Sequence, residues 1–414
     1  MSKKKLLVIG YVWPEPKSSA AGARMMQLLE FFLAEAYSVT FATTASETEY
    51  MADLSGLGIT SEKIELNNES FDIFLKKISP EIVIFDRFMM EEQFGWRVAE
   101  VVPEAIRILD TEDLHFLRKA RQEALKTGKE LTASLLFSDT AKREIASIYR
   151  CDLSLIISPA EIKLLTETFG VPQNILFYLP FMLQEVSEEK KSRLLKFDER
   201  RDFISIGNFL HEPNKDAVLQ LKREIWPLVR AEIKEAKIHI FGAYVPQHIL
   251  ELHHEKEGFL VHGRAVSAKE EIGKARILLA PIRFGAGIKG KFTDAMQVGT
   301  PAVTTNLGAE GMGGENEWNG AIADSPEIFA EAAVDLYKNE ELWKKAQENG
   351  YKILDSHFSE AVHSERLQGK LREISETIEE HRNSNFTGLM LQHQNLSSTK
   401  YLSKYIEAKN KNRP

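Results

Sequence analysis

The chain has 414 residues, of which 43% are hydrophobic and 28% are charged, and its formal net charge is −8. This length predicts about two domains, and the composition is typical of a soluble globular protein. The acidic balance argues against a general nucleic-acid-binding protein. The single cysteine, Cys151, excludes an intrachain disulfide bond and fits a reducing compartment.

The first twenty residues contain no pattern of an export signal. The apolar run after the lysines at positions 3–5 is interrupted by Gly10 and Pro14, so it is too short for the hydrophobic region of a signal peptide. No stretch of the chain approaches the length of a membrane span. We therefore expect a cytoplasmic protein, and we leave open a peripheral contact with the inner face of a membrane.

Apolar runs and amphipathic patterns alternate in the first half of the chain. The first run is followed by a loop that ends near Gly22 and by an amphipathic helix with Met25, Leu28 and Phe32 on one face. This alternation predicts a parallel, doubly wound α/β sheet, in which ligands bind outside the carboxyl ends of the strands. Cys151 directly precedes one of the runs, so we expect a buried structural thiol rather than a nucleophile. Strands are predicted over residues 5–9, 39–43, 82–85, 106–109, 153–157 and 175–178, and further helices over residues 70–78, 91–101, 113–127 and 159–169.

One predicted strand end is rich in charged side chains. Residues 110–118 contain three acids, a histidine and an arginine. Arg118 together with Arg121 could attract a phosphate group. The alternative is an ordinary helix N-terminus, capped by Asp110 or Thr111, with His115 and Arg118 on a solvated face. The sequence leaves both interpretations open.

The charged segment over residues 183–201 lacks a strand pattern and is the best domain boundary. A second alternation follows it, with strands predicted over residues 203–206, 238–241, 259–261, 277–282 and 302–305, and long helices over residues 325–350 and 359–379. The tail, residues 383–414, has a basic end and is predicted to be partly disordered. That basic end could hold an anionic lipid surface or an RNA acceptor, but we favour a solvated terminus.

The clearest functional pattern follows the apolar run at residues 277–282. Glycines allow backbone N–H groups to approach a phosphate, and a helix N-terminus carries about half a positive charge. Lys289 and Lys291 stand at such an end, where lysines are unfavourable for the helix dipole unless an anion is bound. A solvated basic turn in an ordinary α/β unit is the alternative. The glycines of the loop are Gly285, Gly287 and Gly290.

A resemblance to a known family is carried by residues 283–312, which read RFGAGIKGKFTDAMQVGTPAVTTNLGAEGM. They look like the donor-site signature of retaining family 4 glycosyltransferases, which have the GT-B fold. In its common form this signature has a carboxylate one turn into the helix and then a Gly-x-Pro turn, and Asp294, Gly299 and Pro301 fit that order. It departs from the signature at Ala286, which stands in place of the first of two acids, so the resemblance implies the fold and the donor class more firmly than the sugar.

The resemblance implies two Rossmann-like, doubly wound domains that face a cleft. Residues 1–185 would form the acceptor-side domain, residues 200–358 the nucleotide-sugar-binding domain, residues 359–382 a helix that crosses back, and residues 383–414 the tail. Catalytic roles are implied for Lys289, His115 and Arg283. Donor contacts are implied for Gly22, Asn208, Gly263, Arg264, Gly285, Gly287, Ile288, Lys291, Asp294 and Glu310. The alternative for Asp294 is an i, i+3 ion pair with Lys291 on the helix surface.

The implied enzyme moves a hexosyl group from a nucleotide sugar to a glycan, lipid-linked or small-molecule acceptor with retention of configuration, as in polysaccharide biosynthesis. No cofactor and no metal are expected, because the chain contains no Asp-x-Asp sequence and lysines and loop amides would replace the cation. A GT-B epimerase or phosphorylase would use the same cleft. The non-enzymatic alternative is a domain that only binds nucleotide or glycan. No nucleic-acid partner is expected.

Overall fold

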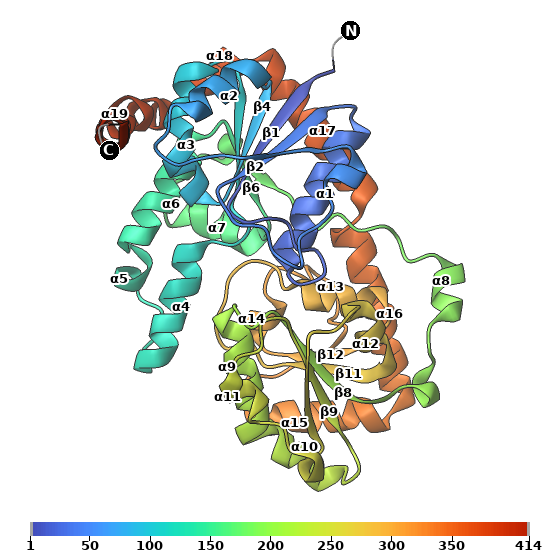
Figure 1. Cartoon of the computed structure of the whole chain (residues 1–414). Coiled ribbons are helices and arrows are strands. Elements are labelled where there is room, and N and C mark those ends of the chain that lie inside the picture. The colour runs from blue at the N-terminus through green and yellow to red at the C-terminus, as the bar shows by residue number, and fades with distance from the viewer. Residues whose placement is uncertain (1–2, 412–414) are drawn as a thin grey trace.

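The computed structural model describes residues 3–411, except for the side chains of residues 394–397 and 411. Two α/β domains lie one above the other in Figure 1, and each is built around a parallel sheet. The first sheet has the strand order β3-β2-β1-β4-β5-β6-β7, and the second has the order β10-β9-β8-β11-β12-β13. This is the doubly wound, two-domain architecture that the alternation of the sequence predicted.

The first domain alternates strands and helices along the chain. Its strands are β1 (Lys5–Gly10), β2 (Ser38–Thr43), β3 (Thr60–Lys63), β4 (Ile82–Asp86), β5 (Ile106–Asp110), β6 (Leu153–Ile156) and β7 (Leu176–Tyr178). Its helices are α1 (Ala20–Ala34), α2 (Ser70–Ile78), α3 (Phe88–Val101), α4 (His115–Thr127), α5 (Ala133–Leu136), α6 (Asp139–Arg150) and α7 (Pro159–Glu167).

The second domain repeats this pattern after the connecting helix α8 (Glu188–Arg193). Its strands are β8 (Arg201–Ile206), β9 (Ile238–Phe241), β10 (Phe259–Gly263), β11 (Ala275–Ala280), β12 (Ala302–Thr304) and β13 (Gly320–Ile322). Its helices are α9 (Glu212–Gln220), α10 (Trp226–Glu232), α11 (Gln247–Leu250), α12 (Ala268–Lys274), α13 (Gly290–Gln297), α14 (Asn306–Ala309), α15 (Pro326–Lys338) and α16 (Glu340–His357).

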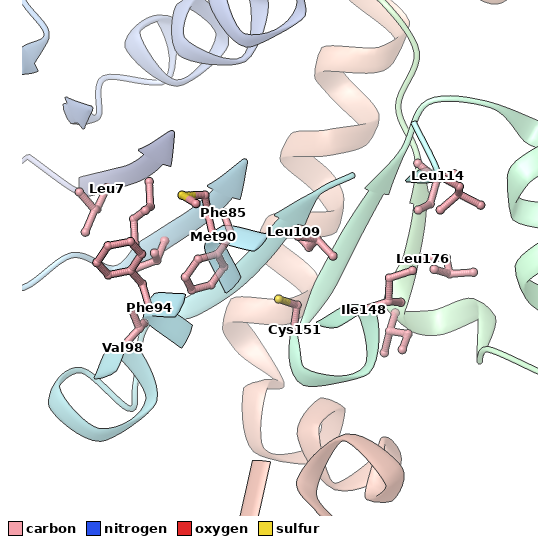
Figure 2. Packing of buried hydrophobic residues seen from close by; sticks show 14 of the residues in the cluster. Leu7, Phe85, Met90, Phe94, Val98, Leu109, Leu114, Ile148, Cys151 and Leu176 are labelled. Atoms are coloured by element: carbon pink, nitrogen blue, oxygen red, sulfur yellow. The ribbon is translucent and has the colours of Figure 1, made fainter. Parts of the chain in front are cut away.

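Both faces of the first sheet are covered, which explains why its strands read as continuous apolar runs. Leu7 and Phe85 pack with Phe94 of α3 on one face (Figure 2). Leu6, the neighbour of Leu7 in β1, belongs to the cluster on the other face, together with Leu29 of α1. Successive side chains of a strand point to opposite faces, so each buried run contributes to two cores.

Cys151 follows α6 and lies within the first of these cores (Figure 2). Cys151 is 2% exposed, and burial raises the pKa of its thiol well above the usual value. A thiol that stays protonated is a poor nucleophile, which confirms the prediction of a buried structural cysteine.

The sequence prediction omitted several elements, among them β3, α6 and the edge strand β13. Every residue of β3 is exposed, so this edge strand carries no alternation. The helix α6 turns Glu144, Ser147 and Arg150 inward, and Arg150 forms a buried ion pair with Glu91 of α3. The same helix also buries Ala141 and Ile148 in the apolar core, so it has a helical stripe that the sequence prediction overlooked.

The chain returns to the first domain after α16. The helix α17 (Glu360–Glu376) contributes Leu367, Leu371 and Ile374 to the core cluster that also contains the residues of α1. The outgoing and returning segments lie side by side, because Leu183 N donates to Phe358 O at 2.7 Å and Leu183 O accepts from Glu360 N at 2.9 Å. Two adjacent crossings connect the domains.

The tail is helical where the structure describes it. It forms α18 (Ile378–Ser384) and α19 (Phe386–Lys411), so the sequence-based expectation of partial disorder differs from the structure, and Arg413 lies outside the described residues. Polar contacts attach these helices to the first domain: Asn385 Nδ2 donates to Tyr149 O at 2.7 Å, and Lys400 pairs with Glu100 at 2.8 Å. No helix within residues 3–411 is long and apolar enough to cross a membrane.

Candidate active site

The loops that follow the carboxyl ends of both sheets meet where the two domains touch, and we call this region the junction. The strand order turns back between β1 and β4 in the first sheet and between β8 and β11 in the second. Parallel sheets bind ligands outside the carboxyl ends of their strands at such points. Asn208, after β8, donates through Nδ2 to Ser18 O, after β1, at 3.2 Å. The predicted donor-side residue Asn208 therefore lies at the junction.

Glycines of the loop before α13 allow the domains to approach each other. A Cβ atom on Gly287 would lie 2.9 Å from Cβ of Asp113, and one on Gly290 would lie 2.8 Å from Cβ of Ala20. Carbon atoms pack at about 3.5–4.0 Å, so neither position has room for a side chain. Gly287 also has a φ of 63°, in the left-handed region that favours glycine. The neighbouring Ile288 is buried in the core of the second domain.

Lys289 and Lys291 are half-buried cations without a paired anion. Lys289 Nζ donates to Gly287 O at 3.0 Å and to Leu307 O at 2.9 Å, and Lys291 Nζ donates to Asn214 Oδ1 at 2.8 Å. Within residues 3–411 neither ammonium has a carboxylate at ion-pair distance. An ammonium has three donors, so one donor of Lys289 and two of Lys291 remain for a ligand.

Burial lowers the pKa of both lysines, to about 8 for Lys289 and to about 7 for Lys291. At Lys289 the charge of Glu310 opposes this shift, while the positive charge of Arg121 adds to it. At Lys291 the positive charge of Lys289 lowers the pKa further. A bound anion would favour the charged forms and raise both pKa values again. The site is therefore arranged to gain free energy from an anionic ligand.

The depressed pKa values predict how affinity for a nucleotide sugar changes with pH. A diphosphate held by the two lysines in their protonated form should bind with full affinity below pH 6, and its affinity should fall as the pH rises through about 7 and about 8. Glu161, whose pKa burial raises to about 7, gains its negative charge over the same interval and acts in the same direction. Calorimetric titration with a nucleotide sugar is suited to this test, because its doubly esterified diphosphate does not titrate in this range.

A variant separates the lysines from the other groups that titrate. Lys291→Arg keeps its charge at every pH used, since a guanidinium stays protonated. In this variant the affinity should decrease less between pH 6 and 7.5 than in the wild type, and the decrease near pH 8 should remain. An unchanged pH profile in Lys291→Arg would show that Lys291 does not bind the anion.

Arg283 and Asp294 each have a partner in the second domain. Arg283 donates to both carboxylate oxygens of Asp216 on α9, at 2.9 Å and 2.5 Å. Asp294 pairs with Lys269 on α12 at 3.7 Å, and burial raises its pKa. The alternative ion pair between Asp294 and Lys291 is wrong, because the ammonium of Lys291 is turned toward Asn214.

The acid-rich strand end of the first domain reaches the junction. Asp113 accepts from Arg118 at 2.9 Å, and its other oxygen lies 3.5 Å from His115 Nε2. A nitrogen of Arg118 lies 3.4 Å from Nε2 of His211, which belongs to the second domain. The predicted residue Arg118 therefore meets a side chain from the opposite domain, and Asp113 connects it to His115.

The alternative of a simple capped helix on a solvated face is wrong for this segment. The side chain of His115 is only 12% exposed, and burial lowers its pKa to about 3, so the imidazole is neutral near pH 7. The first amides of α4, His115 N and Phe116 N, donate to Glu144 of α6 at 3.0 Å and 2.9 Å. The acids of the strand end are thus left for other contacts.

Glu112 has the most unusual environment in this cluster. Its φ is 59°, in the left-handed region that a side chain rarely adopts. Burial and the charge of Asp110 raise its pKa to about 8, while Asp110 itself pairs with Arg24 at 3.0 Å. Backbone strain of this kind concentrates at functional sites, and no sequence pattern predicted it at Glu112.

Glu161 is the residue of the junction that sequence reasoning missed. It is fully buried in α7 and accepts from Gly287 N at 2.8 Å and from Leu114 N at 3.0 Å. Its carboxylate thus joins the glycine loop of one domain to the start of α4 in the other. An acid in the first turn of a helix that begins with Pro159 is an ordinary N-terminal pattern, so no signal distinguished it.

Further predicted residues connect the domains around this centre. Glu310 accepts from Arg121 at 2.7 Å and 2.8 Å, and Arg121 also donates to the carbonyl of Gly285 at 2.9 Å. Arg264 lies over the ring of Tyr50 in the first domain, 4.2 Å from its centroid.

Two predicted glycines, Gly22 and Gly263, occupy places that suit glycine. Gly263 has a φ of 82°. A Cβ on Gly22 would meet the backbone of Glu15 at 2.5 Å.

Within residues 3–411 no group of three or more His, Cys, Asp or Glu side chains is placed so that it could hold a metal ion.

Comparison with known proteins agrees with this architecture. Residues 200–339 match the family described as glycosyl transferases group 1. No curated protein matches the chain. The structure is similar to a glycosyltransferase from Rickettsia africae ESF-5, with a TM-score of 0.66 and 10% identity over 90% of this chain and 99% of that chain.

Two further structures with bound ligands are similar. HepE from Anabaena, in complex with UDP and glucose, has a TM-score of 0.65 and 11% identity over 89% of this chain and 99% of that one. A variant of TarM from S. aureus, in complex with Fondaparinux, alpha-GlcNAc-glycerol and UDP, has a TM-score of 0.56 and 14% identity over 73% of this chain. The match covers 58% of that longer protein. The chain therefore has the GT-B fold, and its second domain matches glycosyl transferases group 1.

Proposed function

We propose that the protein is a retaining glycosyltransferase of family 4 that moves a hexosyl group from a nucleotide sugar to an acceptor. The observation that carries this proposal is the pair of cations without carboxylate partners, Lys289 and Lys291, at the start of α13. Their free donors suit a diphosphate, which is the leaving group of a nucleotide sugar. The match to glycosyl transferases group 1 supports the same reaction class.

In this proposal residues of the second domain, together with Gly22 of the first, hold the donor. Lys289 stabilises the negative charge that develops on the leaving diphosphate, which is the electrostatic contribution that such a transfer needs most. Lys291 and Arg283 assist, and Arg283 would exchange Asp216 for phosphate. Asp294 would accept from the ribose hydroxyls. The remaining donor contacts are proposed for Gly22, Asn208, Gly263, Arg264, Gly285, Gly287, Ile288 and Glu310.

The first domain would supply the acceptor side. His115, neutral because of its burial, is proposed to contact the reacting sugar beside Asp113. The acceptor is a glycan, a lipid-linked molecule or a small molecule. UDP is present in the similar structures of HepE and TarM, so UDP-linked hexoses are the first donors to test.

A product assay tests the function and separates the alternatives. The purified protein is incubated with a UDP-hexose, with and without a glycan acceptor, and UDP and all sugar products are measured. Release of UDP together with a glycosylated acceptor of unchanged anomeric configuration is expected. An isomerised nucleotide sugar would indicate an epimerase, and a sugar phosphate formed from inorganic phosphate would indicate a phosphorylase. Tight binding without any product would reduce the protein to a nucleotide- or glycan-binding module.

The same assay tests the expected independence from metal ions. Two lysines and loop amides would neutralise the diphosphate, so activity after treatment with EDTA should stay close to that of the untreated protein. Addition of Mg²⁺ or Mn²⁺ should then change the rate by less than about twofold. Loss of activity in EDTA that either ion restores would contradict the assignment of the diphosphate to Lys289 and Lys291.

A further inference from the structure

The outward face of α19 is rich in apolar side chains, and the proposed function does not use it. This helix lies along α3 and α6 on the outside of the first domain (Figure 1). A helix on the surface of a soluble domain normally turns polar side chains to solvent. Among the side chains of α19 that the structure describes, the large exposed apolar residues are Phe386 (67%), Met390 (50%), Tyr401 (67%), Leu402 (59%) and Tyr405 (64%).

Helix geometry places the two tyrosines at the centre of this face. Tyr401 and Tyr405 are separated by one turn, whereas Ser403, between them, is buried against Arg97 of α3. Lys404 and Lys409 are exposed and flank the tyrosines on the helix surface. The C-terminal half of the outward face is therefore an aromatic centre with a lysine on each side.

The charges of α19 are sorted between its two sides. Glu407 is the only acid over residues 386–411, and its carboxylate is turned inward to pair with Arg97. Lys400 is also directed to the domain, where it pairs with Glu100. Lys404 and Lys409 have no ion-pair partner within the described residues. The described outward face thus carries positive charge and no carboxylate.

We propose that this outward face of α19 binds a lipid bilayer with anionic headgroups. Tyrosines prefer the boundary between lipid and water, and apolar faces flanked by lysines are typical of helices that lie in that boundary. Lysines close to the surface are attracted to anionic headgroups. The net charge of −8 opposes this weakly, because salt screens charges more than about 10 Å away.

A second copy of the chain fits this face less well. Self-association would cover the apolar side chains, but it would bring Lys404 and Lys409 against an identical face without carboxylates in its described part. Lipid headgroups supply the anions that such a dimer lacks. The proposal goes beyond the proposed function and does not depend on it, because the donor residues lie at the junction.

Vesicle sedimentation with the full chain tests the proposal. Wild-type protein should bind vesicles of phosphatidylcholine with phosphatidylglycerol, should bind pure phosphatidylcholine far less, and should dissociate at high salt. Lys404→Glu with Lys409→Glu should weaken binding by at least about tenfold, and Tyr401→Ser with Tyr405→Ser should weaken it similarly. Two controls in the second domain should bind like wild type. Lys234→Glu with Lys256→Glu makes the same charge change on exposed lysines, and Leu342→Ser removes an exposed apolar side chain.

Two results would overturn the proposal. In the first, anionic vesicles bind the α19 variants as tightly as they bind the wild type, or they bind no protein at all. The other is a wild-type dimer that Tyr401→Ser with Tyr405→Ser converts to a monomer, without any vesicle binding, which would assign the face to a second copy. Calorimetric titration of the same variants with UDP reports on the junction separately and should be unchanged. A chain that binds vesicles but no nucleotide would therefore refute the proposed function alone.

Discussion

Lys289→Ala should lower kcat by more than tenfold. The ammonium of Lys289 is anchored by two backbone carbonyls and has one donor left for a ligand. Loss of one such donor to a developing negative charge costs roughly 100- to 1000-fold in other enzymes. Because the charge on the leaving diphosphate grows in the transition state, kcat should fall more than affinity for the donor. Steady-state kinetics with a saturating acceptor give both quantities.

Two comparisons make this result specific. Lys274→Ala removes an exposed lysine of α12 that pairs with Glu271, and it should leave kcat unchanged. Lys289→Arg keeps a cation at the site and should lose less activity than Lys289→Ala. A wild-type kcat in Lys289→Ala would show that the loop is an ordinary basic turn and that Lys289 does not contribute to catalysis. If Lys289→Ala, and neither of the other two variants, also has a lowered melting temperature, the loss of activity would instead come from the lost contacts of the ammonium with the loop.

Gly287→Ala should lower kcat/KM by about 100-fold, the cost of a misplacement of about 1 Å at a catalytic site. The added Cβ would lie 2.9 Å from Cβ of Asp113 and 3.2 Å from Ile157, both in the first domain. Neither neighbour is the free end of a flexible side chain, so the domains must separate slightly. The hydrogen bond from Gly287 N to Glu161 would lengthen with them. Kinetics and small-angle scattering measure the two effects.

Gly128→Ala is a matched control for Gly287→Ala. Gly128 has nearly the same backbone angle, with a φ of 62° against 63° for Gly287. A Cβ on Gly128 would meet no atom within 4 Å. Both variants therefore carry the same strain, about 1–2 kcal/mol, but only one disturbs the junction. Equal losses of activity in the two variants would contradict the role given to the close approach of the domains.

The sequence predicted most of the fold because the relevant signals are local. Strands buried on both faces, such as β4, read as apolar runs wherever they occur. Among the elements that were not predicted are β3, whose residues are all exposed, and α6, which buries Glu144, Ser147 and Arg150 beside its apolar residues Ala141 and Ile148. Their structure depends on partners elsewhere in the chain.

The part of the candidate site that is continuous in sequence was predictable for the same reason, and its long-range contacts were not. The loop with Lys289 and Lys291 is continuous in sequence, and glycines and lysines at a helix start have a recognisable chemistry. Glu161 contacts Gly287 across a separation of 126 residues, and Arg121 contacts Glu310 across 189 residues. No periodicity or spacing reports such contacts.

The pKa shifts also required the structure. Burial moves Lys291 down to about 7 and Glu112 up to about 8, and burial of a charged side chain cannot be read from its neighbours in sequence. The wrong alternatives, an ion pair between Asp294 and Lys291 and a solvated His115, were both local explanations. In the folded chain Lys291 donates to Asn214, and the buried His115 lies beside Asp113.

Calorimetric titration with a panel of nucleotide sugars tests the central claim most directly. Wild-type protein should bind at least one member of the panel, and bind it more tightly than it binds the free sugar. The variant that combines Lys289→Ala with Lys291→Ala should bind that member at least about tenfold more weakly while keeping its melting temperature within a few degrees. Wild-type affinity in this folded double variant would contradict the claim that the two lysines at the start of α13 hold the diphosphate of a donor.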